Sequence, residues 1–321
     1  MGKVLLFGEP MALLIADTPG PLEEVEHFTR FISGAEVNVA IGLTRLGHEV
    51  EYFTKLGDDP FGHYIVKNLR NNGIGTSQII FDPVYRTGIQ LKNRVVDGSD
   101  PYAPYYRKGS AASHITKDDI KKLCLDEVDL IHITGIPPAL SETVREATFF
   151  LMEEAAKRSI TITFDPNLRP VLWESKNVMV RIINKLATGA QIIMPGIAEC
   201  KILTDMEDEE KIAEFYQNMG VKSIIIKNGK NPTFVKDGND IYKIPCCRVE
   251  KVEDTVGAGD GFAVGVLSGY LEKIGVKQII RRGNAIGAIQ VMSISDNDGL
   301  PTREQLATFM EKAYEEKGGN V

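Results

Sequence analysis

Short apolar runs alternate with longer amphipathic segments along most of the chain. Residues 3–7 form an apolar run of strand length, and residues 36–46, closed by Gly47, carry apolar positions at helical spacing. The same alternation predicts further strands at residues 50–54, 129–134, 160–164, 190–194 and 223–227, and further helices at residues 59–71, 140–158, 261–274, 276–292 and 303–317. This order is typical of a mainly parallel sheet with helices on both faces, an α/β fold.

Two segments break this rhythm, because residues 13–33 and 81–113 are rich in turns and β-like patterns and lack a helical period. We interpret them as a small β lid over the open edge of a core made of residues 1–12, 34–80 and 114–321. No repeat or linker divides residues 1–321, so one domain is expected. Exposed strand edges on such a lid favour pairing with another copy, which predicts a homo-oligomer assembled through the lid.

Composition narrows the possible partners. The formal net charge of −7 argues against a nucleic-acid-binding protein, which usually carries a basic excess. The apolar start is too short for a signal peptide and no run is long enough to span a membrane, so a cytoplasmic protein is expected. The five histidines show no metal-ligand spacing, and the four cysteines (Cys124, Cys200, Cys246 and Cys247) form no C-x-x-C pair, which favours free thiols.

The most informative stretch is residues 254–260, Asp-Thr-Val-Gly-Ala-Gly-Asp, which follows β-like sequence and opens an apolar helix. Gly257 and Gly259 let the backbone approach a ligand closely, and a helix start presents unpaired N–H groups that suit phosphate oxygens. Asp260 would repel a phosphate unless it has another task. Accepting the proton of a hydroxyl that attacks phosphorus is such a task.

A plainer interpretation is that the glycines form a tight turn and Asp260 caps a helix. The chain has no G-x-x-x-x-G-K-[ST] loop, and Phe262 stands where a dinucleotide fingerprint would have its third glycine. The missing third glycine argues against a dehydrogenase.

Residues 254–260 match D-T-x-G-A-G-D, the C-terminal signature of the ribokinase-like (PfkB) carbohydrate kinases, which the chain resembles over nearly its whole length. The family's N-terminal signature is similar to residues 34–40, Gly-Ala-Glu-Val-Asn-Val-Ala, followed by Gly47 and Gly57. Ser33 stands where the family usually has a second glycine. The resemblance implies a three-layer α/β/α core with a β-sheet lid.

The resemblance also implies transfer of the γ-phosphoryl group of ATP to a sugar hydroxyl, with Mg²⁺. Asp260 would be the base, and the backbone of Gly257, Ala258 and Gly259 would hold the charge that develops on the phosphoryl group. The positions that match the family's nucleotide contacts are Asn167, Lys227, Gly229 and Asn284. Activation by a monovalent cation is left open.

The family's N-x-x-E motif, which holds Mg²⁺ through water, is altered here. Glu199 is present, but Gly196 replaces the asparagine. Glu199 is therefore expected to act through water, with a solvated glutamate at a helix start as the alternative.

Substrate contacts are expected from the rim of the core and from the lid. Gly34 allows close approach, and the amides of Asn38 and Gln90 suit hydroxyl groups. Residues 105–113 begin with Tyr105, Tyr106 and Arg107, and Arg169 follows a predicted strand. Since guanidinium matches carboxylate with two parallel hydrogen bonds, Arg107 and Arg169 favour an anionic substrate; a structural ion pair is the alternative for Arg169.

Within the family, residues 105–113 are most similar to members that phosphorylate the C6 hydroxyl of 2-keto-3-deoxygluconate, an anionic keto-deoxy sugar acid, in sugar acid catabolism. Residues 165–169 (Asp-Pro-Asn-Leu-Arg) also occur in fructokinases, so a fructokinase or another sugar kinase of the family is the alternative. A relative that binds nucleotide or sugar without catalysis is a third hypothesis, which the intact Asp260 disfavours.

Overall fold

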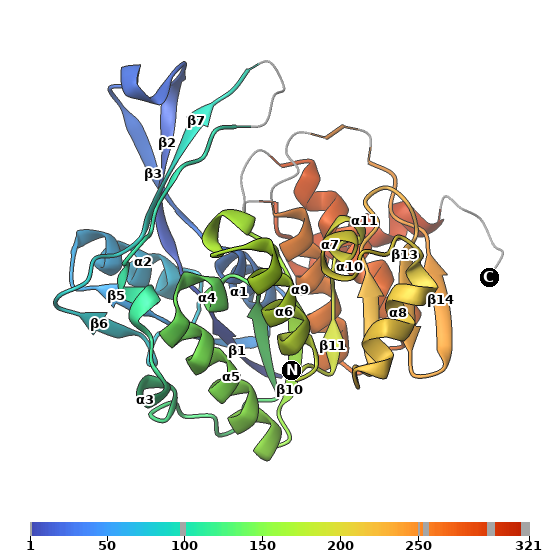
Figure 1. The fold of residues 1–321 in the computed structure, drawn as a ribbon. Coiled ribbons are helices and arrows are strands. Elements are labelled where there is room, and N and C mark those ends of the chain that lie inside the picture. Colours follow the sequence, from blue (N-terminus) through green and yellow to red (C-terminus); the bar gives the residue numbers. More distant parts are fainter. Residues whose placement is uncertain (1, 97–100, 250, 253–256, 294–298, 316–321) are drawn as a thin grey trace.

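An eight-stranded sheet forms the centre of the computed structural model, which describes residues 2–96, 101–249, 251–252, 257–293 and 299–315 (Figure 1). Its strand order within the described residues is β14-β13-β12-β11-β10-β9-β1-β4. The strands are β1 (Lys3–Phe7), β4 (Glu49–Phe53), β9 (Leu130–Thr134), β10 (Thr161–Asp165), β11 (Ile192–Ile193), β12 (Ser223–Ile226), β13 (Thr233–Asp237) and β14 (Asp240–Ile244). All neighbours pair in parallel from β4 to β12, and β13 and β14 are antiparallel. The expected α/β fold is confirmed.

Helices cover both faces of this sheet, because its inner strands are apolar on both sides. In β1, Leu5 and Phe7 belong to one buried cluster and Val4 and Leu6 to the other. On the first face lie α3 (Lys117–Ile120), α4 (Pro137–Leu140), α5 (Glu142–Lys157), α6 (Lys176–Ala187), α7 (Ile197–Thr204) and α8 (Glu209–Asn218). On the second lie α1 (Ala35–Arg45), α2 (Pro60–Asn71), α9 (Ala258–Leu271), α10 (Val276–Val291) and α11 (Arg303–Glu315).

A smaller sheet projects from the core and has the order β3-β2-β7-β8 (Figure 1). Its strands are β2 (Met11–Pro19), β3 (Phe28–Ser33), β7 (Ile89–Arg94) and β8 (Tyr105–Tyr106). β2 pairs antiparallel with β3 and parallel with β7, so two segments far apart in the chain build it. The short helix η1 (Leu22–Glu24) lies between β2 and β3.

Only part of residues 81–113, the second predicted lid segment, belongs to the smaller sheet. β6 (Ile80–Asp82) pairs instead with β5 (Lys55–Gly57) in a separate two-stranded sheet. The short helix η2 (Ala111–His114) is largely buried and packs on α5, and η3 (Pro170–Leu172) follows β10. The smaller sheet also begins at Met11, two residues earlier than expected.

The parallel strands end at one edge of the large sheet, which is where loops of this architecture form binding sites. β10 leads there into residues 165–169, and β12 leads into Lys227. The first turns of α1 and α9 pack together above this edge, as the hydrogen bond between Asn38 and Asp260 shows. In the described part of the chain, no helix is long and apolar enough to cross a membrane.

Candidate active site

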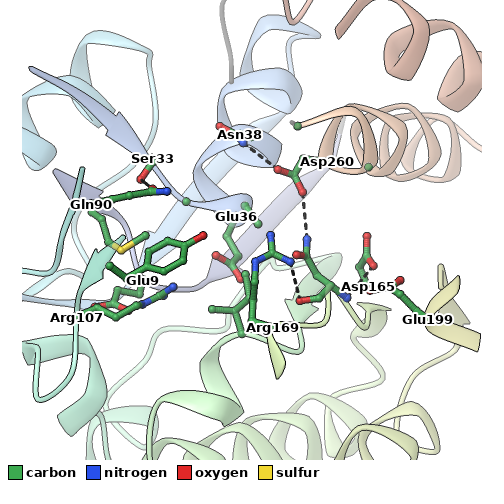
Figure 2. A pocket seen from close by; sticks show the side chains of 18 of the residues that line it. Glu9, Ser33, Glu36, Asn38, Gln90, Arg107, Asp165, Arg169, Glu199 and Asp260 are labelled. Carbon is green, nitrogen blue, oxygen red and sulfur yellow. Dashed lines mark hydrogen bonds and ion pairs between the residues drawn. The ribbon is translucent and has the colours of Figure 1, made fainter. Parts of the chain in front are cut away.

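A cavity of about 380 Å³ lies between the smaller sheet and the carboxyl ends of the strands (Figure 2). The predicted site residues that line it are Gly34, Asn38, Gln90, Tyr105, Arg107, Asn167, Arg169, Glu199, Lys227, Gly257, Gly259 and Asp260. These residues come from seven separate segments of the chain, so the fold brings together most of the site expected from the sequence.

Asp260 lies in the first turn of α9 and is 9% exposed. Its Oδ2 accepts a hydrogen bond of 2.8 Å from the Asn38 side-chain amide, and its Oδ1 accepts one of 3.2 Å from that of Asn167. Burial raises the pKa of Asp260 to about 7, and the bond from Asn38 opposes this rise. A carboxylate with such a pKa can take and release a proton near neutral pH.

The start of α9 forms a cradle for an anion beside Asp260. Gly257 adopts φ +78°, a left-handed conformation that suits glycine, and no side chain of the described residues caps the helix. The first N–H groups of a helix have no partner within it, and they coincide with the positive end of the helix dipole. A Cβ on Gly259 would lie 3.6 Å from the Lys227 Nζ, so the ammonium group borders the cradle. Asp254–Val256 of the signature lie outside the described residues.

Lys227, at the end of β12, lies among acidic groups from the end of β10 and from α7. Its Nζ lies 2.6 Å from the Asp165 Oδ2. Burial works to lower the pKa of Lys227, but Asp165 and Glu199 outweigh it and raise the pKa, so the side chain stays charged. A charged lysine at the helix start adds to the attraction for an anion.

Glu199 accepts hydrogen bonds of 2.7 Å from the backbone N–H groups of Leu168 and Gly196. Gly196 is the N-cap of α7, so Glu199 completes a capping box there. Burial and the charge of Asp165 raise the pKa of Glu199, and Lys227 opposes them. Among the described residues, no group of three or more His, Cys, Asp or Glu side chains is arranged to hold a metal directly.

Arg107 and Arg169 differ in their partners. Arg107 is 6% exposed, and its Nε and one terminal nitrogen each lie 2.6 Å from the Oε2 of Glu9. The other oxygen of Glu9 accepts a 2.5 Å hydrogen bond from Ser110. The charge of Arg107 is therefore already matched by a carboxylate from the loop that joins β1 to β2.

Among the described residues, Arg169 donates only to backbone carbonyls, at 3.0 Å to Leu168 and 3.3 Å to Asn167. Within the described residues it has no carboxylate partner, so the alternative of a structural ion pair for Arg169 finds no support there. Its guanidinium points into the cavity (Figure 2). It is the arginine whose charge the cavity leaves available to an anion.

The smaller sheet contributes the remaining lining. The Gln90 Oε1 accepts a 2.8 Å hydrogen bond from Ser33, and the Arg107 guanidinium lies 5.4 Å from the centre of the Tyr105 ring. Gly34 precedes α1 with φ +139°, and a Cβ there would lie 3.1 Å from the Glu9 carbonyl oxygen. A larger residue at position 34 would thus be strained and crowded.

Four predicted site residues do not line the cavity. Tyr106 is 63% exposed on the smaller sheet, and Ala258 contributes no atom to the wall. Gly229 lies beyond β12, and Asn284 on α10 accepts from Thr233 and donates to the Pro245 carbonyl. The last two remain candidates for a ligand that extends past Lys227.

The sequence interpretation omitted several residues that line the cavity. The lining residues that it gave no role are Glu9, Met11, Ser33, Ala35, Glu36, Ile136 and Asp165. Glu9 follows β1 directly, and a charged residue at the carboxyl end of a predicted parallel strand is a usable signal. Glu36 offers a weaker signal: it is buried in the first turn of α1 and accepts from Thr134, and burial raises its pKa.

The family model of the pfkB family carbohydrate kinases matches residues 1–303 of the chain. Curated proteins named 2-dehydro-3-deoxygluconokinase are similar along nearly the whole chain. The one from Bacillus subtilis is 44% identical over 305 residues, covering 95% of this chain and 94% of its own length. The one from Thermoproteus tenax is 33% identical over 305 residues, covering 94% and 92%.

Among solved structures, a PfkB protein from Polaromonas sp. JS666 is similar with a TM-score of 0.88 and 40% identity, covering 96% of this chain and 99% of its own. A 2-dehydro-3-deoxygluconokinase from Thermotoga maritima is similar with a TM-score of 0.84 at 22% identity, covering 97% and 98%. The ribokinase-like fold that the sequence predicts is confirmed.

Proposed function

The chain belongs to the pfkB family of carbohydrate kinases, and we propose that it transfers the γ-phosphoryl group of ATP to the C6 hydroxyl of 2-dehydro-3-deoxygluconate, also called 2-keto-3-deoxygluconate. The products would be ADP and the 6-phosphorylated sugar acid. The observation that carries this proposal is the arrangement around one cavity of Asp260, the start of α9 and Arg169, which has no carboxylate partner among the described residues. A proton acceptor, a phosphate cradle and a carboxylate anchor are what this reaction needs.

The residues present fit ATP and Mg²⁺. The α9 start suits phosphate oxygens, and Lys227 supplies a fixed positive charge next to it. Gly229 and Asn284 would contact the rest of the nucleotide. Glu199 and Asp165 offer carboxylate oxygens for waters of a Mg²⁺ ion. Such an ion, when bound, neutralises charge on the transferring phosphate.

The groups of the chain divide the chemistry between them. Asp260 accepts the proton of the attacking hydroxyl, while Lys227 and the α9 N–H groups stabilise negative charge on the phosphoryl group. Arg169 pairs with the carboxylate of the sugar acid and sets its orientation. Gln90, Tyr105 and Gly34 complete the sugar site from the side of the smaller sheet.

We further propose that the chain is a single domain in which the smaller sheet acts as a lid. Closing it over the sugar would exclude water and limit wasteful hydrolysis of ATP. The free edges of β3 and β8 favour an oligomer in which lids pair.

The test is ADP production from ATP–Mg²⁺ with 2-dehydro-3-deoxygluconate, fructose and ribose as separate acceptors. We expect a strong preference for the sugar acid. Preference for fructose would overturn the substrate assignment and leave the kinase and Asp260 in place. No ADP with any acceptor would favour a binding protein without catalysis. Repeating the assay with and without K⁺ determines whether a monovalent cation activates.

A further inference from the structure

Both carboxylate oxygens of Asp260 accept hydrogen bonds from side-chain amides of two separate segments of the chain. Asn38 belongs to α1, on one face of the large sheet (Figure 2), and Asn167 belongs to the loop after β10. An ionised carboxylate offers only acceptors, so the nitrogen of each amide must face it. Two amides fix both the position of the carboxylate and its rotation about the Cβ–Cγ bond.

Asn38 lines the cavity, but its side-chain nitrogen is used to hold Asp260. The side chain is 4% exposed, and its nitrogen points at Asp260 (Figure 2). Its Oδ1 is sealed from solvent and has no partner within the described part of the chain. An amide that accepted a hydrogen bond from a sugar hydroxyl would present this oxygen to the cavity.

Asn167 is fixed by its own backbone. It adopts φ +40°, a conformation that asparagine tolerates better than most residues, and its N–H donates to the Asp165 Oδ1 at 3.2 Å. Asp165 is in turn paired with Lys227. The Asn167 amide is thus presented to Asp260 from a loop that is stabilised by residues at the ends of β10 and β12.

The charges that face Asp260 from other elements act in both directions. Asp165 at the end of β10 and Glu36 on α1 disfavour its ionised form. Arg169 favours that form, and so does Lys227 at the end of β12. Hydrogen bonds from neutral amides favour the charged carboxylate of Asp260. They do so without adding a positive charge that would also attract the carboxylate of the substrate.

We propose that Asn38 and Asn167 form an amide clamp that keeps Asp260 ionised and aimed into the cavity. Both are then positioning residues, and neither is a primary contact of sugar or nucleotide. This assigns them a different role from the substrate and ATP contacts expected from the sequence. The inference rests on the proposed function, in which Asp260 is the base.

The test compares Asn38→Leu and Asn167→Gly with the wild type, measuring kcat and KM for 2-dehydro-3-deoxygluconate across pH. Leucine is similar in size to asparagine but donates nothing, and glycine accepts the positive φ at position 167. We expect the acidic limb of the kcat profile to move up by roughly one pH unit, because a hydrogen bond to the charged form is lost. Activity should recover at alkaline pH, with little change in KM. Asn68→Leu is the matched control, because the Asn68 amide lies on α2 and donates to Tyr64 in the same helix.

A rise in KM with an unmoved limb would overturn the clamp and restore a direct substrate contact. A loss of kcat that is equal at every pH would also overturn it, since that indicates only a structural defect. Because Asn38→Leu changes a buried site, Asn167→Gly on the partly exposed loop keeps the test valid if the first variant fails to fold.

A titration without turnover separates this inference from the proposed function. The ¹³C carboxyl signal of Asp260, assigned by its absence in Asp260→Asn, should titrate at higher pH in Asn38→Leu than in the wild type. If that shift appears while no acceptor is phosphorylated, the proposed function fails and the amides still hold the carboxylate. If the signal titrates unchanged, the clamp fails even in an active kinase.

Discussion

The two sides of the cavity treat charge differently. On the strand-end side, Asp260 and Arg169 meet neutral amides and backbone carbonyls, and neither is neutralised by a direct ion pair within the described residues. On the smaller-sheet side, Arg107 is matched by Glu9, which also accepts from Ser110. The charges of Asp260 and Arg169 are therefore available for reaction and binding, whereas the charge of Arg107 is already neutralised by Glu9.

This difference indicates that one side of the cavity serves catalysis and binding, and that the other side stabilises the fold. The loops at the strand ends are anchored by a rigid sheet, which can hold reactive groups in fixed positions. The Glu9–Arg107 pair joins the smaller sheet to the loop after β1, so it ties the two parts of the molecule together. We expect substitutions on the strand-end side to change turnover and anion binding most, and those on the other side to change stability more.

The largest effect is expected on the strand-end side, at Asp260. Asp260→Asn keeps the size of the side chain but cannot take a proton, so kcat should fall about 10²–10⁴-fold, the usual contribution of a general base. Binding of ADP, measured by calorimetry, should stay close to the wild-type value. Near-wild-type turnover in this variant would refute the base assignment.

A smaller, selective effect is expected at Arg169. Arg169→Met should raise KM for 2-dehydro-3-deoxygluconate by about 10- to 100-fold, the range expected when a hydrogen bond to a charged group is lost. The KM for a neutral sugar such as fructose should not rise, because fructose has no carboxylate that could pair with Arg169. Steady-state kinetics with both acceptors measures this, and equal losses for the two would contradict a carboxylate anchor.

The smallest effect on catalysis is expected on the smaller-sheet side. Arg107→Met should raise KM less than Arg169→Met, since Glu9 already offsets the charge of Arg107. It should instead lower the free energy of unfolding by about 3–5 kcal/mol, because it leaves Glu9 buried without its partner.

The matched variant for Arg107 removes both charges. Glu9→Gln combined with Arg107→Met should recover much of the lost stability in urea denaturation, since no uncompensated charge remains. If the double variant loses as much free energy of unfolding as the two single variants added together, Glu9 and Arg107 do not stabilise each other. If Arg107→Met weakens substrate binding more than Arg169→Met, the contrast between the two sides is wrong.

The sequence predicts the layered fold well because its signal is local. Buried parallel strands are continuous apolar runs, and long helices such as α5 repeat their apolar positions. The prediction omits α6, α7 and α8, and α7 has only eight residues, too few for a clear period. The antiparallel pair β13 and β14 at the sheet edge is also omitted, although the β-like character of residues 242–244 was evident.

The candidate site is predictable where a motif places its residues and much less so where tertiary contacts decide their roles. Asp260 and the glycines before it follow from their spacing. No local pattern shows that Glu9 neutralises Arg107, because 98 residues separate the two along the chain. For the same reason, the role of Asn38 as a donor to Asp260 is visible only once α1 and α9 are packed together.

The packing of α1 against α9 also has a consequence for synthesis. The hydrogen bond between Asn38 and Asp260 closes a loop of 222 residues, so a growing chain exposes the apolar face of α1 until α9 has left the ribosome. Contacts of such long range form late and slowly. Until they form, the exposed apolar face of α1 can aggregate or bind a chaperone. Phosphoryl transfer thus begins only with nearly the whole chain in place, and truncated products of translation stay inactive.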